Sequence, residues 1–196
     1  MIKRDEHGII GQHRRDEPDY LDMGDSCMKT SIAVIGGLCH RTDLFYFYEK
    51  GLVVRHPYDK EYNNPKDTSR DQLICLMSAK YLMGYHSALD YSCFINKDFL
   101  GMPDIQWFMR KCKGDNRFSW LGDKTLRASI WYAAKHDPDH ELNQLFCICL
   151  VMGKEYIRLL CESHPDWKKN LTDYWGGWRD QPEIGNEFIK RIEKEL

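Results

Sequence analysis

The stretch that decides the fold class is apolar and lies late in the chain: Leu145-Phe146-Cys147-Ile148-Cys149-Leu150-Val151-Met152. It follows Asp137 and Pro138, residues typical of a helix start, and we expect the helix to run on to about residue 162. A helix that is apolar on every face is stable only when other elements cover it. The sequence therefore predicts one long, central, buried helix.

Working outward from this helix, helix signals dominate and strand signals are nearly absent. Asp25 or Ser26 can cap a helix that runs to about Leu38. Thr68 and Asp71 form a variant of the capping box ahead of an apolar run that Gly84 ends. Shorter segments complete the set: helices at about 43–48, 85–97, 103–112, 124–135, 167–174 and 182–196, and one extended segment at 52–54.

Short connections between helices favour antiparallel hairpins. No linker rich in Gly, Ser or Pro divides the chain, so we expect a single all-α domain over residues 1–196. Residues 1–24 are polar and turn-rich, and they are predicted to form an irregular arm anchored by Ile9 and Ile10.

Composition excludes several classes of protein. With 42% hydrophobic residues among 196, the chain has globular rather than disordered composition. Its 28 basic and 30 acidic residues leave a net charge of −2, so nucleic acid is not an expected partner. No apolar run approaches the roughly 20 residues that span a bilayer, and residues 1–8 lack the apolar core of a secretory signal. We therefore expect no membrane association and a cytoplasmic location, or the virion if the protein is viral.

The eight cysteines are scattered through apolar segments, and no Cys-x-x-Cys pair occurs. This pattern indicates reduced, buried thiols rather than a disulfide framework or a thiolate metal site. His136 and His140 have an i, i+4 spacing, but Pro138 between them marks a helix start, so they would not share one helix face. We expect neither a metal nor a cofactor.

Two polar motifs lie at predicted helix starts. In Gly24-Asp25-Ser26 the side chains offer an acceptor and a hydroxyl, although taken alone this motif is better explained by a simple helix cap and a turn. Ser69-Arg70-Asp71-Gln72 holds more polar groups than a cap requires. Because an arginine in a first turn opposes the helix dipole, Arg70 needs an anionic partner. Asp25 and Asp71 are candidates, and the result is either a structural bridge or part of a site.

Two further motifs lie in loops. Arg55-His56-Pro57 ends the extended segment, and His56 is the histidine best placed to act as an acid, a base or a ligand. The alternative is a rigid turn with a solvated imidazole. Trp120, in a second polar loop, can stack on a sugar ring or a base, or it can close the edge of the core.

These motifs together resemble part of an α/α-toroid, the fold of many glycoside hydrolases and polysaccharide lyases and of some phage-encoded proteins of unknown role. The resemblance rests on Gly24–Ser26 with Thr30 one turn on, and on Arg55–Pro57 leading into Ser69–Gln72, and it covers roughly residues 20–125. It implies inner helices whose N-terminal ends surround a sugar-binding cleft lined by carboxylates and aromatic rings.

Two functions of different classes are compatible with these features. The first is a carbohydrate-binding or carbohydrate-cleaving protein, and whether it is an enzyme stays open. If it is a glycoside hydrolase, Asp25 and Asp71 are the expected carboxylates, one protonated and one ionised. The other residues assigned to this site are His56 as a further catalytic candidate and, for substrate binding, Arg55, Ser69, Arg70, Gln72 and Trp120.

The second function is that of a non-enzymatic interaction protein, of viral or assembly type, in which the same Arg–Asp network is structural. Its partner would be another protein or further copies of the chain. In that case exposed aromatic side chains mark the contact surface, with Tyr46, Tyr48, Trp175 and Trp178 as candidates. A third interpretation, an anion-binding regulator that uses Arg55 and Arg70, has less support.

Overall fold

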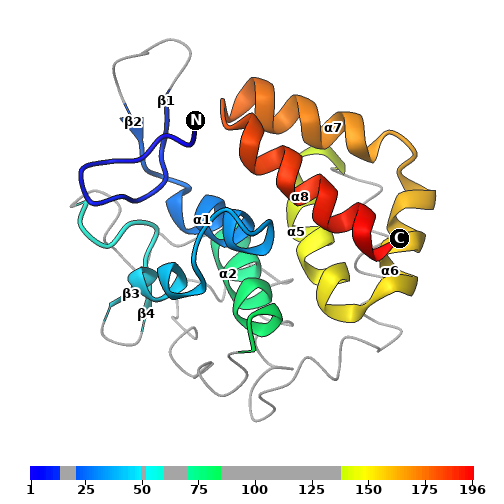
Figure 1. Ribbon diagram of the computed structural model, residues 1–196, viewed down its shortest axis with the longest axis horizontal. Helices are drawn as coiled ribbons and strands as arrows, with labels where there is room; N and C mark the ends of the chain where they lie inside the picture. Colours follow the sequence, from blue (N-terminus) through cyan, green and yellow to red (C-terminus); the bar gives the residue numbers. More distant parts are fainter. Residues whose placement is uncertain (14–20, 50–51, 60–69, 85–137) are drawn as a thin grey trace.

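The computed structural model describes residues 1–13, 21–49, 52–59, 70–84 and 138–196, and these residues are mostly helical (Figure 1). The all-α class is therefore confirmed in this coarse form. The helices are α1 (Ser26–Ile35), the 3-10 helix η1 (Arg41–Phe47), α2 (Arg70–Leu82), α5 (Pro138–Met152), α6 (Lys154–Ser163), α7 (Trp167–Asp173), the π-helix η6 (Tyr174–Trp178) and α8 (Pro182–Glu195). The predicted helices at 85–97, 103–112 and 124–135 lie outside the described residues.

Strands are limited to two short antiparallel pairs. β1 (Gln12–His13) pairs with β2 (Leu21–Asp22), and β3 (Tyr48–Glu49) pairs with β4 (Leu52–Val53). The first pair belongs to the N-terminal arm. Ile9 and Ile10 anchor this arm, because their side chains are only 3% and 0% exposed. The second pair contains the extended segment that the sequence predicted.

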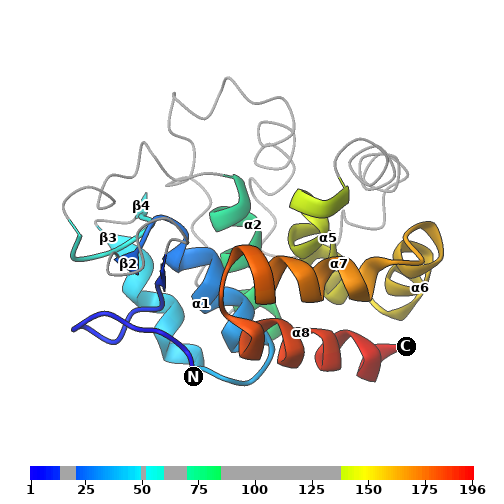
Figure 2. The ribbon, with the colours of Figure 1, turned by 90° about the horizontal axis from the view of Figure 1, so that it is seen from above.

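The core forms around α5, whose side chains from Leu142 to Leu150 are all buried. α2 packs between α1 and α5, and α8 packs against α1, α7 and η6. Figure 2 shows α7 and α8 running side by side. The apolar stretch Leu145–Leu150 thus occupies the buried position predicted for it.

The prediction of one long helix over 138–162 is wrong at a single residue. Gly153 adopts a φ of 108°, which ends α5 and begins α6. Its amide donates to the Cys149 carbonyl at 2.8 Å, and the chain then turns into the next helix. A residue with a side chain rarely adopts this backbone geometry, so glycine permits the break.

Helix α1 ends at Ile35, three residues before the predicted end at about Leu38, because two glycines follow it. Gly37 has a φ of 81°, the Gly37 amide donates to Val34 at 3.1 Å, and the Leu38 amide donates to Ala33 at 2.8 Å. These two bonds form a Schellman motif. A Cβ at Gly36 would lie 3.3 Å from the backbone of Glu187, so this glycine also allows α8 to approach α1 closely.

Trp175-Gly176-Gly177-Trp178 lies in the π-helix η6. Trp175 is fully buried, and its Nε1 donates to Asn143 Oδ1 on α5 at 2.9 Å. The expectation that Trp175 is an exposed contact residue is therefore wrong. Its ring fills the core, and its only polar atom has a partner inside it.

The described cysteines are free thiols, as the sequence predicted, and four of the six are buried as expected: Cys27, Cys75, Cys147 and Cys149. Cys39 and Cys161 are only partly buried. Burial raises the pKa of Cys161 to about 11 and raises that of Cys149 further, so both stay protonated. None of the helices in the described ranges combines the length and apolar character needed to cross a membrane.

Candidate functional site

The candidate site begins at the N-terminal end of α1, where Asp25 occupies the N-cap position without capping the helix. Its carboxylate is directed to other elements instead. Gln72, on the first turns of α2, donates its Nε2 to Asp25 Oδ1 at 2.8 Å. Arg179, which follows η6, forms an ion pair with Asp25 Oδ2 through Nη1. The acceptor that could have capped α1 thus joins α1 to α2 and to the C-terminal part of the chain.

Arg179 has further acceptors and is 5% exposed. Its Nε donates to Tyr174 Oη at 2.7 Å, and Nη1 also donates to Gln12 Oε1 of β1 at 3.2 Å. The Gln72 amide oxygen accepts the Met28 amide at 2.9 Å, which fixes the orientation of Gln72. We call this group the Asp25 cluster, and its members are Gln12, Asp25, Lys29, Gln72 and Arg179.

Asp25 is ionised in this environment. Burial opposes ionisation, but the charges of Arg179, Lys29 and Arg55 and the hydrogen bond from Arg179 outweigh it, and the pKa of Asp25 lies below its ordinary value. The Asp25 side chain remains 22% exposed, whereas that of Arg179 is 6% exposed. The carboxylate is therefore the more accessible partner of a largely buried ion pair.

Lys29 lies one helical turn after Asp25 and is completely buried. Its Nζ has no hydrogen-bond partner among the described residues. Burial lowers the pKa of the Lys29 amine to about 7, although the charge of Asp25 acts in the opposite direction. A buried amine without a partner loses its hydration and gains no hydrogen bond in return.

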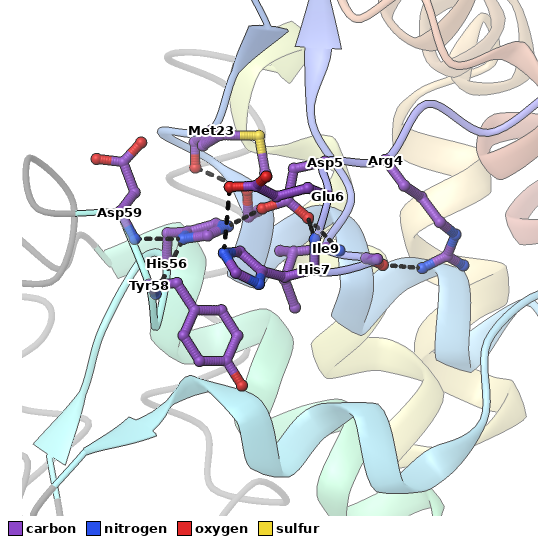
Figure 3. A network of polar contacts seen from close by, with 11 residues as sticks. Arg4, Asp5, Glu6, His7, Ile9, Met23, His56, Tyr58 and Asp59 are labelled. Atoms are coloured by element: carbon purple, nitrogen blue, oxygen red, sulfur yellow. Dashed lines mark hydrogen bonds and ion pairs between the residues drawn. The ribbon is translucent and has the colours of Figure 1, made fainter.

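His56 belongs to a separate network, shown in Figure 3. Its Nε2 lies 3.0 Å from Asp5 Oδ2, and its Nδ1 accepts the amides of Tyr58 and Asp59 at 3.2 and 2.8 Å. Because Nδ1 is an acceptor, Nε2 carries the proton and the ring is neutral. Burial lowers the pKa of His56, against the opposing charge of Asp5.

The Asp5 carboxylate also accepts the amides of His7 and Ile9 at 3.0 and 2.7 Å. The Asp5–His56 pair therefore joins the N-terminal arm to the loop after β4. Both ring nitrogens of His56 are engaged, and the ring is 1% exposed. The rigid-turn alternative describes this histidine, except that the ring is buried instead of solvated.

The remaining predicted site residues are placed to different extents. Arg55 is half-buried, its carbonyl accepts the Cys27 amide at 3.2 Å, and its Nη1 lies 3.5 Å from the Gly24 carbonyl oxygen. Arg70 and Asp71 are the first two residues of α2, and their side chains lie outside the part of the chain that the structure describes. Ser69 and Trp120 lie outside the described residues.

Three members of the cluster were not identified from the sequence. Arg179 and Gln12 join the cluster only through tertiary contacts, and no local sequence pattern indicates that they belong to it. Lys29 had a recognisable signal, since it is a single charged residue in the otherwise uncharged helix Ser26–Ile35. A charged side chain within a helix buried on every face needs a partner or a ligand.

Within the described ranges, no group of three His, Cys, Asp or Glu side chains could hold a metal ion. Comparison of the chain with known protein families, with curated proteins and with solved structures yields no match.

Proposed function

We propose that this protein binds a carbohydrate at the Asp25 cluster, with Asp25 as the ionised carboxylate of the site. The observation that carries the proposal is the position of Asp25 at a helix start without a capping bond. Its carboxylate is held ionised by Arg179 and oriented by Gln72, and it keeps 22% of its side-chain surface exposed. Oriented carboxylates and amides are suitable partners for sugar hydroxyl groups, which need both acceptors and donors.

Cleavage of a glycosidic bond requires a second carboxyl group that is protonated. Asp71 is our candidate, since it directly precedes Gln72 in α2, and the contact between Gln72 and Asp25 brings this part of α2 to the cluster. Arg55 would bind substrate, and we further propose contributions from Ser69, Arg70 and Trp120. An α/α-toroid arrangement of the hairpins is part of the same proposal.

A non-enzymatic interaction protein is the second candidate, and one observation favours it. Arg179 is almost fully buried and has acceptors on β1, α1 and η6, as a structural clamp requires. In this interpretation the contact surface would include the exposed aromatic rings of Phe45, Tyr46 and Tyr58, which are 40%, 48% and 54% exposed.

Substitution Asp25→Asn separates the two candidates. Asparagine keeps the shape and one acceptor, so the fold should persist while the charge is lost. Binding of a panel of mono- and oligosaccharides would be measured by calorimetry, and cleavage would be measured with nitrophenyl glycosides. Asp173→Asn is the matched control, because Asp173 is exposed and forms its ion pair with Lys169, which is also exposed.

The carbohydrate proposal predicts that the wild-type protein and Asp173→Asn bind the same sugar and that Asp25→Asn loses at least about tenfold in affinity. If the wild-type protein binds no sugar of the panel, the proposal is wrong. If Asp25→Asn binds as well as the wild type and differs only in stability, the clamp interpretation replaces it.

A further inference from the structure

Lys29 belongs to the Asp25 cluster, but it takes no part in the Asp25–Arg179 ion pair or in the hydrogen bonds that join the other members. Its side chain is 0% exposed, and its Nζ has no hydrogen-bond partner in the described part of the chain. The charges that act on it come from Asp25 and Asp22, which are acidic, and from Arg179, which is basic. A lysine amine that is desolvated and close to another cation has a lowered pKa, so a larger share of it is neutral and nucleophilic than in an exposed lysine.

Lys80 shows that full burial alone does not produce this situation. It is 1% exposed, on α2, and its Nζ lies 4.5 Å from the centre of the Phe45 ring, where a cation is stabilised. The Nζ of Lys29 has no hydrogen-bond partner among the described residues. Among the residues that the structure describes, two lysines are fully buried: Lys80, whose amine lies over an aromatic ring, and Lys29, whose amine has no hydrogen-bond partner.

We propose that the Lys29 amine condenses with the carbonyl carbon of an aldehyde or ketone ligand, such as the open-chain form of a reducing sugar, to give an imine. Asp25, one helical turn before Lys29, keeps 22% of its side-chain surface exposed, so the approach that this proposal requires would be from the Asp25 side. The inference rests on the proposed function for the class of ligand, and it adds a covalent step at the same site.

The step is balanced without any further reagent. The Nζ lone pair attacks the carbonyl carbon, the carbon–oxygen π bond breaks, and one amine proton is transferred to the oxygen. The second amine proton leaves with that oxygen as water while the carbon–nitrogen double bond forms. Asp25 lies one turn from Lys29 on the same helix face, so its carboxylate can carry these protons and stabilise a protonated imine.

Reductive trapping tests this inference. The whole protein is incubated at pH 7 with glyceraldehyde and sodium cyanoborohydride, which reduces an imine to a stable secondary amine. Modified lysines are then identified by mass spectrometry of peptides. An ordinary lysine amine is almost entirely protonated at pH 7, so Lys29 should be modified more than about tenfold faster than exposed Lys190.

Two variants and one comparison complete the design. Lys29→Met should abolish the fast modification, whereas Lys80→Met should leave it unchanged. Modification of Lys29 at a rate no greater than that of Lys190 or Lys80 in the folded wild-type protein would overturn the inference, and this result does not depend on the folding of any variant.

The outcomes remain distinct from those of the sugar panel. Sugar binding without modification of Lys29 would refute the imine and leave the proposed function standing. Rapid modification of Lys29 in a protein that binds no sugar of the panel would support the imine and refute the proposed carbohydrate function.

Discussion

The contact between α8 and the π-helix η6 gives the sharpest prediction of stability, because it depends on the absence of one methyl group. A Cβ at Gly185 would lie 2.5 Å from Trp175 Cβ and 2.7 Å from Trp175 Cγ. These atoms belong to the base of a fully buried side chain, whose Nε1 is held by Asn143. Trp175 cannot rotate away without losing this bond, so α8 itself must move in the variant Gly185→Ala.

The magnitude follows from two opposing effects. Overpacking of a buried contact costs about 1–3 kcal/mol, and the contact here is at the severe end of that range. Alanine in place of glycine within a helix returns about 1 kcal/mol. We therefore expect Gly185→Ala to lower the free energy of unfolding by about 2 kcal/mol, measured from urea denaturation followed by circular dichroism.

Gly176 provides the control, since it lies in the adjacent π-helix and a Cβ there would meet no atom within 4 Å. Gly176→Ala should leave stability unchanged or slightly raised. If Gly185→Ala proved as stable as the wild type, the close approach of α8 to Trp175 would be incorrect.

Further predictions concern the charged groups. Arg179→Met should lower the free energy of unfolding by roughly 3 kcal/mol, because it leaves the Asp25 carboxylate without its cation. In urea titrations, the double variant Arg179→Met with Asp25→Asn should lose less stability than the sum of the two single variants. Lys29→Met should raise the free energy of unfolding at pH 7. Because the pKa of Lys29 is lowered from 10.5 to about 7, the wild type loses stability as pH falls through this interval. The difference in stability between Lys29→Met and the wild type should therefore shrink above pH 10. Burial lowers the pKa of His56 from 6.5, so the stability that the neutral ring contributes should be lost as pH falls below 6.5 through the lowered value. A wild-type urea midpoint that does not fall between pH 7 and pH 5 relative to that of His56→Gln would contradict the burial of the neutral ring.

The sequence predicted those helices whose ends carry local signals. The end of α2 before Gly84 and the start of α8 at Pro182 follow from a glycine and a proline that act within a turn or two of the chain. The start of α1 was also predicted near Asp25, although Asp25 occupies the N-cap position without a capping bond. The division of α5 from α6 was missed because the apolar pattern continues past Gly153. Periodicity does not reveal a change in one backbone angle, although a glycine within a long helical pattern is a warning of it.

The candidate site was only partly predictable for a different reason. Asp25 was identified because it lies at a helix start, and Gln72 because its helix start holds more polar groups than capping requires. Arg179 is separated from Asp25 by 154 residues, and nothing in its local sequence indicates which carboxylate it meets. His56 was correctly singled out as unusual, but its partner is Asp5 in the N-terminal arm, a segment without periodicity from which no contact could be inferred.

Lys29 is the residue at which the two interpretations of the Asp25 cluster differ most. A structural clamp needs Asp25, Arg179, Gln12 and Gln72, since each of them satisfies a polar atom of another. It does not need Lys29, whose buried amine costs free energy and has no hydrogen-bond partner among the described residues. An apolar side chain of similar length would make the clamp more stable. The lysine is therefore explained better by a ligand that meets its amine than by the stability of the fold, and the trapping experiment addresses that difference directly.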